Sequence, residues 1–151
     1  MQERRGGPHA RQWSGLVGHA LAHADRQAEA VEFRALDLVD AMVAHSRADH
    51  PDEACGVIAG SVATGVPERF IPMVNAARSP TFYEFDSTDL LRLYREMDDR
   101  DEVPVVVYHS HTATEAFPSR TDIALASEPD AHYVLISTRE TGAEPGPYEL
   151  R

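Results

Sequence analysis

The stretch VPVVVYHSH at residues 103–111 constrains the fold of this chain more than any other. It opens with a continuous apolar run, rich in valine, that is too short for a typical helix and follows a charged segment. Such a run predicts a buried strand. The strand ends in two histidines separated by one serine, and this pattern needs an explanation of its own.

Weaker patterns on both sides of this run predict further strands and helices. Apolar or alternating segments bounded by glycine and proline predict strands at 54–61, 68–76, 81–86 and 131–138, and PYELR at 147–151 predicts the start of another. Helical spacing predicts helices at 36–50, 87–101 and 119–129. Pro72 predicts that the strand at 68–76 lies at a sheet edge or carries a bulge. The expected fold class is a single domain of mixed α and β structure.

The two longer helices each have an expected buried face. Apolar residues recur at helical spacing, at Leu36, Val39, Met42 and Val43 in the first helix and at Leu90, Leu93, Tyr94 and Met97 in the second. Ser87 is the expected N-cap of the second helix. Residues 1–34 have no sustained hydrophobic period, and we expect a flexible extension or an added helix there, with the domain at 35–151.

Composition excludes several classes of partner. The 151 residues carry a formal net charge of −11, which disfavours binding to nucleic acid and to anionic membranes. No apolar run approaches the roughly 18 residues that a membrane span needs. The single cysteine, Cys55, cannot form an intramolecular disulfide, which fits the reducing cytoplasm.

The two histidines point the same way if they lie on a strand. Side chains alternate between faces, so His109 and His111 share one face with their α carbons roughly 6.6 Å apart, while Ser110 faces the other way. Two imidazoles can then bind one zinc ion, which in catalytic sites has three protein ligands and an open position. Asp122, expected in the first turn of the following helix, is the natural third ligand.

Simpler interpretations exist for each half of this pattern. Ser119 and Asp122 also fit a capping box, in which the two side chains satisfy amides at the start of a helix. A lone histidine pair is often incidental. The two halves together, separated by one loop, favour the metal site.

A catalytic zinc site also needs a general base for its water. The sequence offers Asp52 and Glu53 before the strand at 54–61, Glu84 and Asp86 around the segment 81–86, and Glu115 in the loop after the histidines. Residue types and spacing do not choose among these carboxylates.

The motifs together resemble the JAMM (MPN-plus) zinc metallopeptidases, a family that includes deubiquitinating isopeptidases. The resemblance rests on DEACGVIAG at 52–60 and on HSH, PS and an aspartate within 109–122, and extends from about Leu36 to the end. It implies an MPN/JAMM-type, cytidine-deaminase-like fold with a central mixed sheet flanked by helices. It also implies His109, His111 and Asp122 as ligands of one zinc ion, Glu53 as general base, and Ser119 as hydrogen-bond donor to the oxyanion.

Longer stretches narrow the resemblance to an actinobacterial branch of this family. HPDEACGVIAG, IPMVNAARSPTFYEFDS and YHSHTATEAFPSRTD are similar to peptidases that release cysteine from the C-terminus of a ubiquitin-like sulfur carrier protein. The expected function is therefore hydrolysis of the carrier–cysteine amide in the cytoplasm. A broader peptidase on other ubiquitin-like tails and a non-catalytic MPN scaffold are the alternatives.

Two departures from the family pattern concern the loop and the end of the chain. Thr112 stands where many members have proline, which should alter the loop without removing a ligand. The sequence ends at Arg151, where relatives continue with at least one more strand, so the sheet is expected to lack its C-terminal strand.

Overall fold

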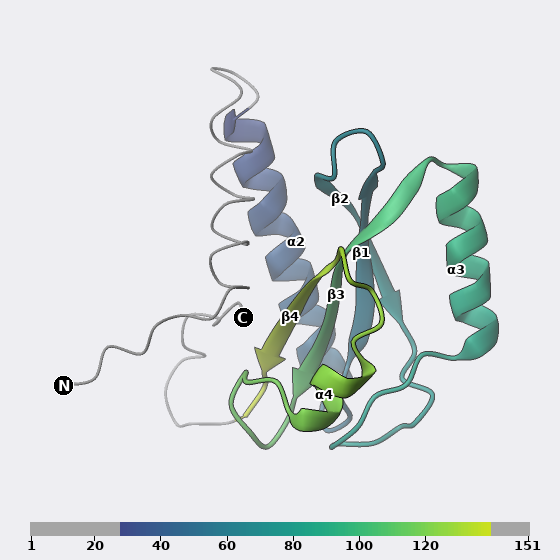
Figure 1. Ribbon diagram of the computed structural model, residues 1–151. Coiled ribbons are helices and arrows are strands. Elements are labelled where there is room, and N and C mark those ends of the chain that lie inside the picture. The colour runs from purple at the N-terminus through teal and green to yellow at the C-terminus, as the bar shows by residue number, and fades with distance from the viewer. Residues whose placement is uncertain (1–27, 140–151) are drawn as a thin grey trace.

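The computed structural model describes residues 28–139, which form a four-stranded sheet with helices on both sides (Figure 1). The strands lie in the order β2-β1-β3-β4. Their bounds are Cys55–Ser61 for β1, Pro67–Met73 for β2, Glu102–His111 for β3 and His132–Ser137 for β4. The helices are α2 at Ala28–Asp49, α3 at Ser87–Asp99 and α4 at Arg120–Leu125. No helix in this described part is long and apolar enough to cross a membrane.

The sheet is mixed because its connections differ in length. A tight turn joins β1 to β2, and Gly65 at its end has a φ of 62°, a conformation that glycine adopts without steric cost. β1 also pairs antiparallel with β3, whereas β4 pairs parallel with β3 after the connection through α4. The long strand β3 therefore lies inside the sheet, as the apolar run predicted. β2 lies at the edge, as Pro72 predicted.

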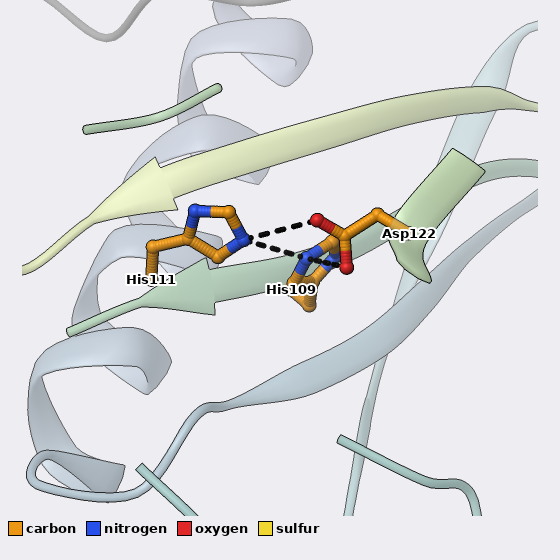
Figure 2. A group of neighbouring side chains, drawn as sticks. All are labelled: His109, His111 and Asp122. Carbon is orange, nitrogen blue, oxygen red and sulfur yellow. Dashed lines mark hydrogen bonds and ion pairs between the residues drawn. The ribbon is translucent and has the colours of Figure 1, made fainter. Parts of the chain in front are cut away.

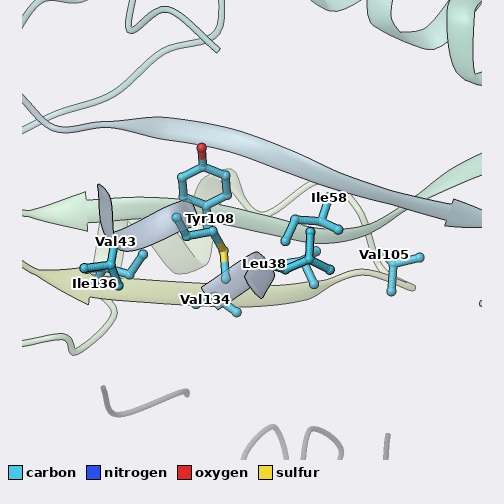
Figure 3. Close-up of a cluster of buried hydrophobic side chains, with 9 residues drawn as sticks. Leu38, Val43, Ile58, Val105, Tyr108, Val134 and Ile136 are labelled. Atoms are coloured by element: carbon cyan, nitrogen blue, oxygen red, sulfur yellow. The ribbon is translucent and has the colours of Figure 1, made fainter. Parts of the chain in front are cut away.

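Each face of the sheet packs against one long helix (Figure 1). On one face, α2 covers a cluster of buried side chains that includes Leu38, Val43, Ile58 and Tyr108 (Figure 3). On the other face, α3 contributes Leu93 and Met97 to a second cluster with side chains of β1. Because side chains alternate along a strand, His109 and His111 lie on the face opposite to Tyr108.

Three details of the predicted elements are wrong. The segment 81–86 is a loop with a single bridge between Phe85 and Asn75, because the Asn75 side chain binds backbone groups that a neighbouring strand would otherwise pair. Asp86 caps α3 in place of Ser87, because its carboxylate accepts hydrogen bonds from two amides of the first turn. The expected buried faces also differ, because Leu36 is 59% exposed and Tyr94 is 40% exposed, and Leu38 is buried in place of Leu36.

The terminal predictions fall outside the described residues. These are most of the N-terminal segment 1–34 and the strand at 147–151. The division into an extension at 1–34 and a domain at 35–151 stays a prediction.

Candidate active site

His109, His111 and Asp122 converge on one point at the end of β3 (Figure 2). The two Nε2 atoms of the histidines lie 3.2 Å apart. One oxygen of Asp122 lies 3.2 Å from Nε2 of His109, and its other oxygen lies 3.2 Å from Nε2 of His111. Strand alternation brings the two rings to one face, and the first turn of α4 brings the carboxylate to them.

The hydrogen bonding of His111 fixes which of its nitrogens faces this point. Its Nδ1 lies 3.0 Å from the carbonyl oxygen of Glu115, which can only accept, so Nδ1 carries the hydrogen. In neutral His111 the Nε2 atom then carries no hydrogen, and its lone pair faces an oxygen of Asp122. Two acceptors at this distance repel each other unless a proton or a metal ion lies between them.

The spacing of the two histidine nitrogens fits zinc. Donors that lie about 2.0 to 2.1 Å from one ion at the corners of a tetrahedron are about 3.3 Å apart. The two Nε2 atoms are 3.2 Å apart, and each lies 3.2 Å from a different oxygen of Asp122. Both histidines are buried and Asp122 is half-buried, so an ion bound here would be shielded from bulk water on the protein side.

Electrostatics favour the forms of these residues that bind a metal. Burial lowers the pKa of His109, which favours its neutral form. Burial alone would raise the pKa of Asp122, but hydrogen bonds from His109 and Ser119 outweigh it and hold the pKa well below the ordinary range. A neutral imidazole and an ionised carboxylate are the forms that bind a metal.

Ser119 and Asp122 form the capping box that their spacing predicted. The Ser119 hydroxyl oxygen accepts a hydrogen bond of 3.1 Å from the Asp122 amide, and the Ser119 amide donates one of 2.6 Å to the Asp122 carboxylate. The Ser119 hydroxyl accepts this hydrogen bond at its oxygen, so the bond does not use the hydroxyl hydrogen. The capping box is therefore compatible both with metal binding by Asp122 and with donation by Ser119 to a substrate.

Glu53 lies directly before β1 and is only 5% exposed. Burial raises its pKa to about 7, with His111 lowering the pKa and Asp122 raising it. Its place next to the cluster follows from the adjacent residue, Ala54, whose amide and carbonyl both hydrogen-bond to Ser110, the residue between the two histidines. The pairing of β1 with β3 explains this position, because Cys55 lies opposite His109 in the sheet. A pKa near neutrality suits a general base.

A cavity of about 350 Å³ lies on the α3 side of the sheet. It is lined mainly by apolar and aromatic side chains, among them Val57, Tyr83, Leu93, Tyr94 and Tyr133. Tyr83 lines this cavity and also contacts the histidine cluster, because its ring stacks on the ring of His109 with centroids 4.4 Å apart.

Residues 35–149 match the family described as prokaryotic homologs of the JAB domain. The chain belongs to this family. It is 67% identical over 115 residues to CysO-cysteine peptidase of Mycobacterium tuberculosis, covering 76% of each chain. It is 32% identical over 108 residues to a desampylase of Haloferax volcanii, covering 68% of this chain and 78% of that one. The solution structure of a protein from Desulfitobacterium hafniense shares the fold with a TM-score of 0.58 and 35% identity, over 67% of this chain and 70% of that one.

These matches confirm the resemblance that the motifs indicated, and with it the JAB/MPN fold and membership of a peptidase family. The metal that this JAB domain binds and the roles of its individual residues stay predictions. The geometry nevertheless separates the carboxylates that the sequence left open.

Glu53 differs from the other candidate bases of the JAB domain in its burial. Glu84 is exposed, and Asp86 is engaged as the N-cap of α3. Glu115 has a side chain that is 77% exposed and lies 3.9 Å from Arg139. Asp52 is half-buried, so Glu53 is the buried one among these carboxylates. Its neighbour Ala54 bonds to Ser110 between the two histidines.

The sequence patterns did not indicate the residues that support the cluster. Tyr83 covers the ring of His109, and Thr114 lies 3.2 Å from Nδ1 of His111 beside the Glu115 carbonyl. Asn75 organises the loop that carries Tyr83. The sequence NAARSP at 75–80 is rich in turn-forming residues and could have indicated a loop at this point. No periodicity marks Tyr83, because its contact depends on the path of the loop.

Proposed function

We propose that this chain is a zinc-dependent peptidase that hydrolyses the amide bond between the C-terminus of a ubiquitin-like sulfur carrier protein and cysteine, which releases free cysteine in the cytoplasm. The observation that carries the proposal is the convergence of His109, His111 and Asp122 beside the buried Glu53. The similarity to a CysO-cysteine peptidase over three quarters of the chain supports the choice of substrate.

Each residue of the cluster has a proposed role. His109 and His111 hold the metal through their Nε2 atoms, and Asp122 holds it through its carboxylate, which lies 3.2 Å from each of these nitrogens. A zinc ion bound there would polarise the scissile carbonyl and lower the pKa of a water molecule. The donor set fits zinc because imidazole nitrogen and carboxylate oxygen are both common zinc ligands.

The protein residues would then move the proton and stabilise charge. Glu53 takes a proton from the attacking water and delivers it to the nitrogen of the departing cysteine. Ser119 donates its hydroxyl hydrogen to the carbonyl oxygen of the substrate as negative charge develops there. The capping box holds Ser119 in place, because its oxygen accepts the Asp122 amide.

A broader peptidase on other ubiquitin-like tails is the second candidate. The 32% identity to a desampylase favours it, because that relative is named for a different activity. A non-catalytic scaffold is disfavoured by the geometry, since docking alone needs neither three converging donors nor a buried Glu53 beside them.

The decisive experiment uses two synthetic conjugates of one sulfur carrier protein. The first ends in a C-terminal cysteine amide, and the second ends in an isopeptide bond to a lysine peptide. Mass spectrometry should show loss of one cysteine from the first conjugate, stopped by a chelator and restored by zinc. Cleavage that survives complete metal removal would contradict the mechanism, and equal cleavage of both conjugates would favour the broader peptidase.

A further inference from the structure

The loop between β2 and α3 is built around one buried amide side chain. Asn75 is 5% exposed and uses both its donor hydrogens and its oxygen. Its Nδ2 donates to the carbonyl oxygens of Glu53 and Phe82, each at 2.9 Å. Its Oδ1 accepts from the amides of Ala77 at 3.0 Å and Glu84 at 3.1 Å. These four bonds exhaust the hydrogen-bonding capacity of an asparagine side chain.

The same loop also binds the backbone amide of Glu53. The Glu53 amide donates to the carbonyl oxygen of Ser79 at 2.9 Å, while its carbonyl accepts from Asn75. On the following residue, the Ala54 amide donates to the hydroxyl of Ser110 at 2.8 Å, and the Ser110 amide donates to the Ala54 carbonyl at 2.9 Å. The backbone that carries Glu53 is therefore held by the loop on one side and by the residue between the two histidines on the other.

The same loop reaches the histidine cluster at two further points. Tyr83 follows Phe82, which binds Asn75, and its ring stacks on His109 with an interplanar angle of 25°. Thr112, directly after His111, donates its hydroxyl to the carbonyl of Pro80 at 2.8 Å. One side chain thus organises a loop that contacts both the backbone of Glu53 and the histidine part of the cluster.

We propose that Asn75 is a positioning residue that fixes Glu53 and the Tyr83 loop against the histidine cluster. The proposal rests on the proposed function, because it assigns Asn75 to the placement of the general base. The burial of Asn75 supports it, since a buried amide that loses its partners carries a large desolvation cost, so the loop has one strongly preferred arrangement. A general base displaced by about 1 Å can lose about 100-fold in rate.

Hydrogen exchange tests the positioning without any reaction. Asn75→Ala removes the acceptor of the Ala77 and Glu84 amides directly. It also frees the loop whose Ser79 carbonyl accepts the Glu53 amide. All three amides should exchange at least about 10-fold faster, while those of the central strand β3 should not change. Met42→Ala is the control, because Met42 is a residue of α2 whose side chain is buried against the opposite face of the sheet. Unchanged exchange at Glu53 in Asn75→Ala would overturn the proposal, as would an equal acceleration in Met42→Ala.

A double-mutant cycle tests whether Asn75 acts through Glu53. Asn75→Asp keeps the acceptor oxygen but replaces both donors, so we expect kcat on the carrier–cysteine conjugate to fall about 100-fold with KM changed less than about threefold. In a Glu53→Gln background, the same substitution should lower kcat by less than about threefold further, because the group being positioned is already disabled. Met42→Ala should leave kcat near that of the wild type.

The outcomes separate this inference from the function on which it rests. Losses of kcat that multiply in the double mutant would overturn the positioning role. Failure of Asn75→Asp and Asn75→Ala to fold, with Met42→Ala folded, would also overturn it, because Asn75 would then serve the fold as a whole. Absence of turnover by the wild type would count against the proposed function alone, and the exchange rates would still decide whether Asn75 fixes Glu53.

Discussion

Replacing Ser119 separates two roles of one hydroxyl group, capping of α4 and stabilisation of the oxyanion. In the structure its oxygen accepts a hydrogen bond of 3.1 Å from the Asp122 amide. The proposed function adds a donated bond to the substrate, made by the hydroxyl hydrogen. Alanine removes both bonds, whereas asparagine is a good N-cap and keeps the first while it lacks the hydroxyl.

The two roles predict losses in different quantities. Loss of an N-cap costs about 0.5 to 2 kcal/mol of folding stability. A domain of about 5 kcal/mol would retain about 3 kcal/mol, which leaves about 99% of the molecules folded. A stability effect alone therefore lowers the measured rate by only about 1%. Loss of an oxyanion donor lowers kcat by about 100 to 1,000 fold, or about 2.7 to 4 kcal/mol of barrier.

The assay compares three variants in urea unfolding and in steady-state cleavage of the carrier–cysteine conjugate. Ser119→Ala should lose both stability and kcat, and Ser119→Asn should lose kcat while it keeps most of its stability. Asp86→Ala is the matched control, because Asp86 caps α3 by accepting from the Thr88 and Asp89 amides. It should lose stability and keep kcat.

The result that would refute this reasoning is specific. If Ser119→Ala retains kcat within about threefold of the wild type while its stability falls, the hydroxyl is a cap and does not serve the reaction. Loss of zinc from Ser119→Ala would point instead to displacement of Asp122, so metal content must be measured in parallel.

Three further substitutions test other parts of the site and the core. Glu53→Gln should retain zinc but lower kcat by about 100 to 10,000 fold, because glutamine cannot carry the proton. Single-turnover kinetics measure this loss, and a wild-type rate would exclude Glu53 as the base. Purified protein should contain one zinc per chain by elemental analysis. Asp122→Asn should lose most of this zinc together with activity, since the third ligand is weakened. Full zinc content with only a stability loss would leave Asp122 as a capping residue. Gly56→Ala should destabilise the protein by about 1 to 3 kcal/mol in urea unfolding, because an added Cβ would lie 2.5 Å from the ring of the fully buried Tyr108. A change below about 0.5 kcal/mol would show that the ring can move aside.

Local patterns in the sequence determined the elements nearest the site. The apolar run before His109 predicted β3, and the two-residue period of a strand placed His109 and His111 on one face. The spacing of Ser119 and Asp122 predicted the start of α4 and its capping box. Such features depend on residues within a few positions of each other, so they can be recognised without knowing the rest of the fold.

Only the tertiary structure decided which carboxylate lies beside the histidines and which loop covers them. Glu53 is far from His109 in the sequence, and the pairing of β1 with β3 brings the two together. The segment 81–86 has the composition of a strand, but Asn75 binds its backbone groups and turns it into a loop that lays Tyr83 on His109. Burial and the pairing of distant segments are properties of the whole packed chain, and no local pattern encodes them.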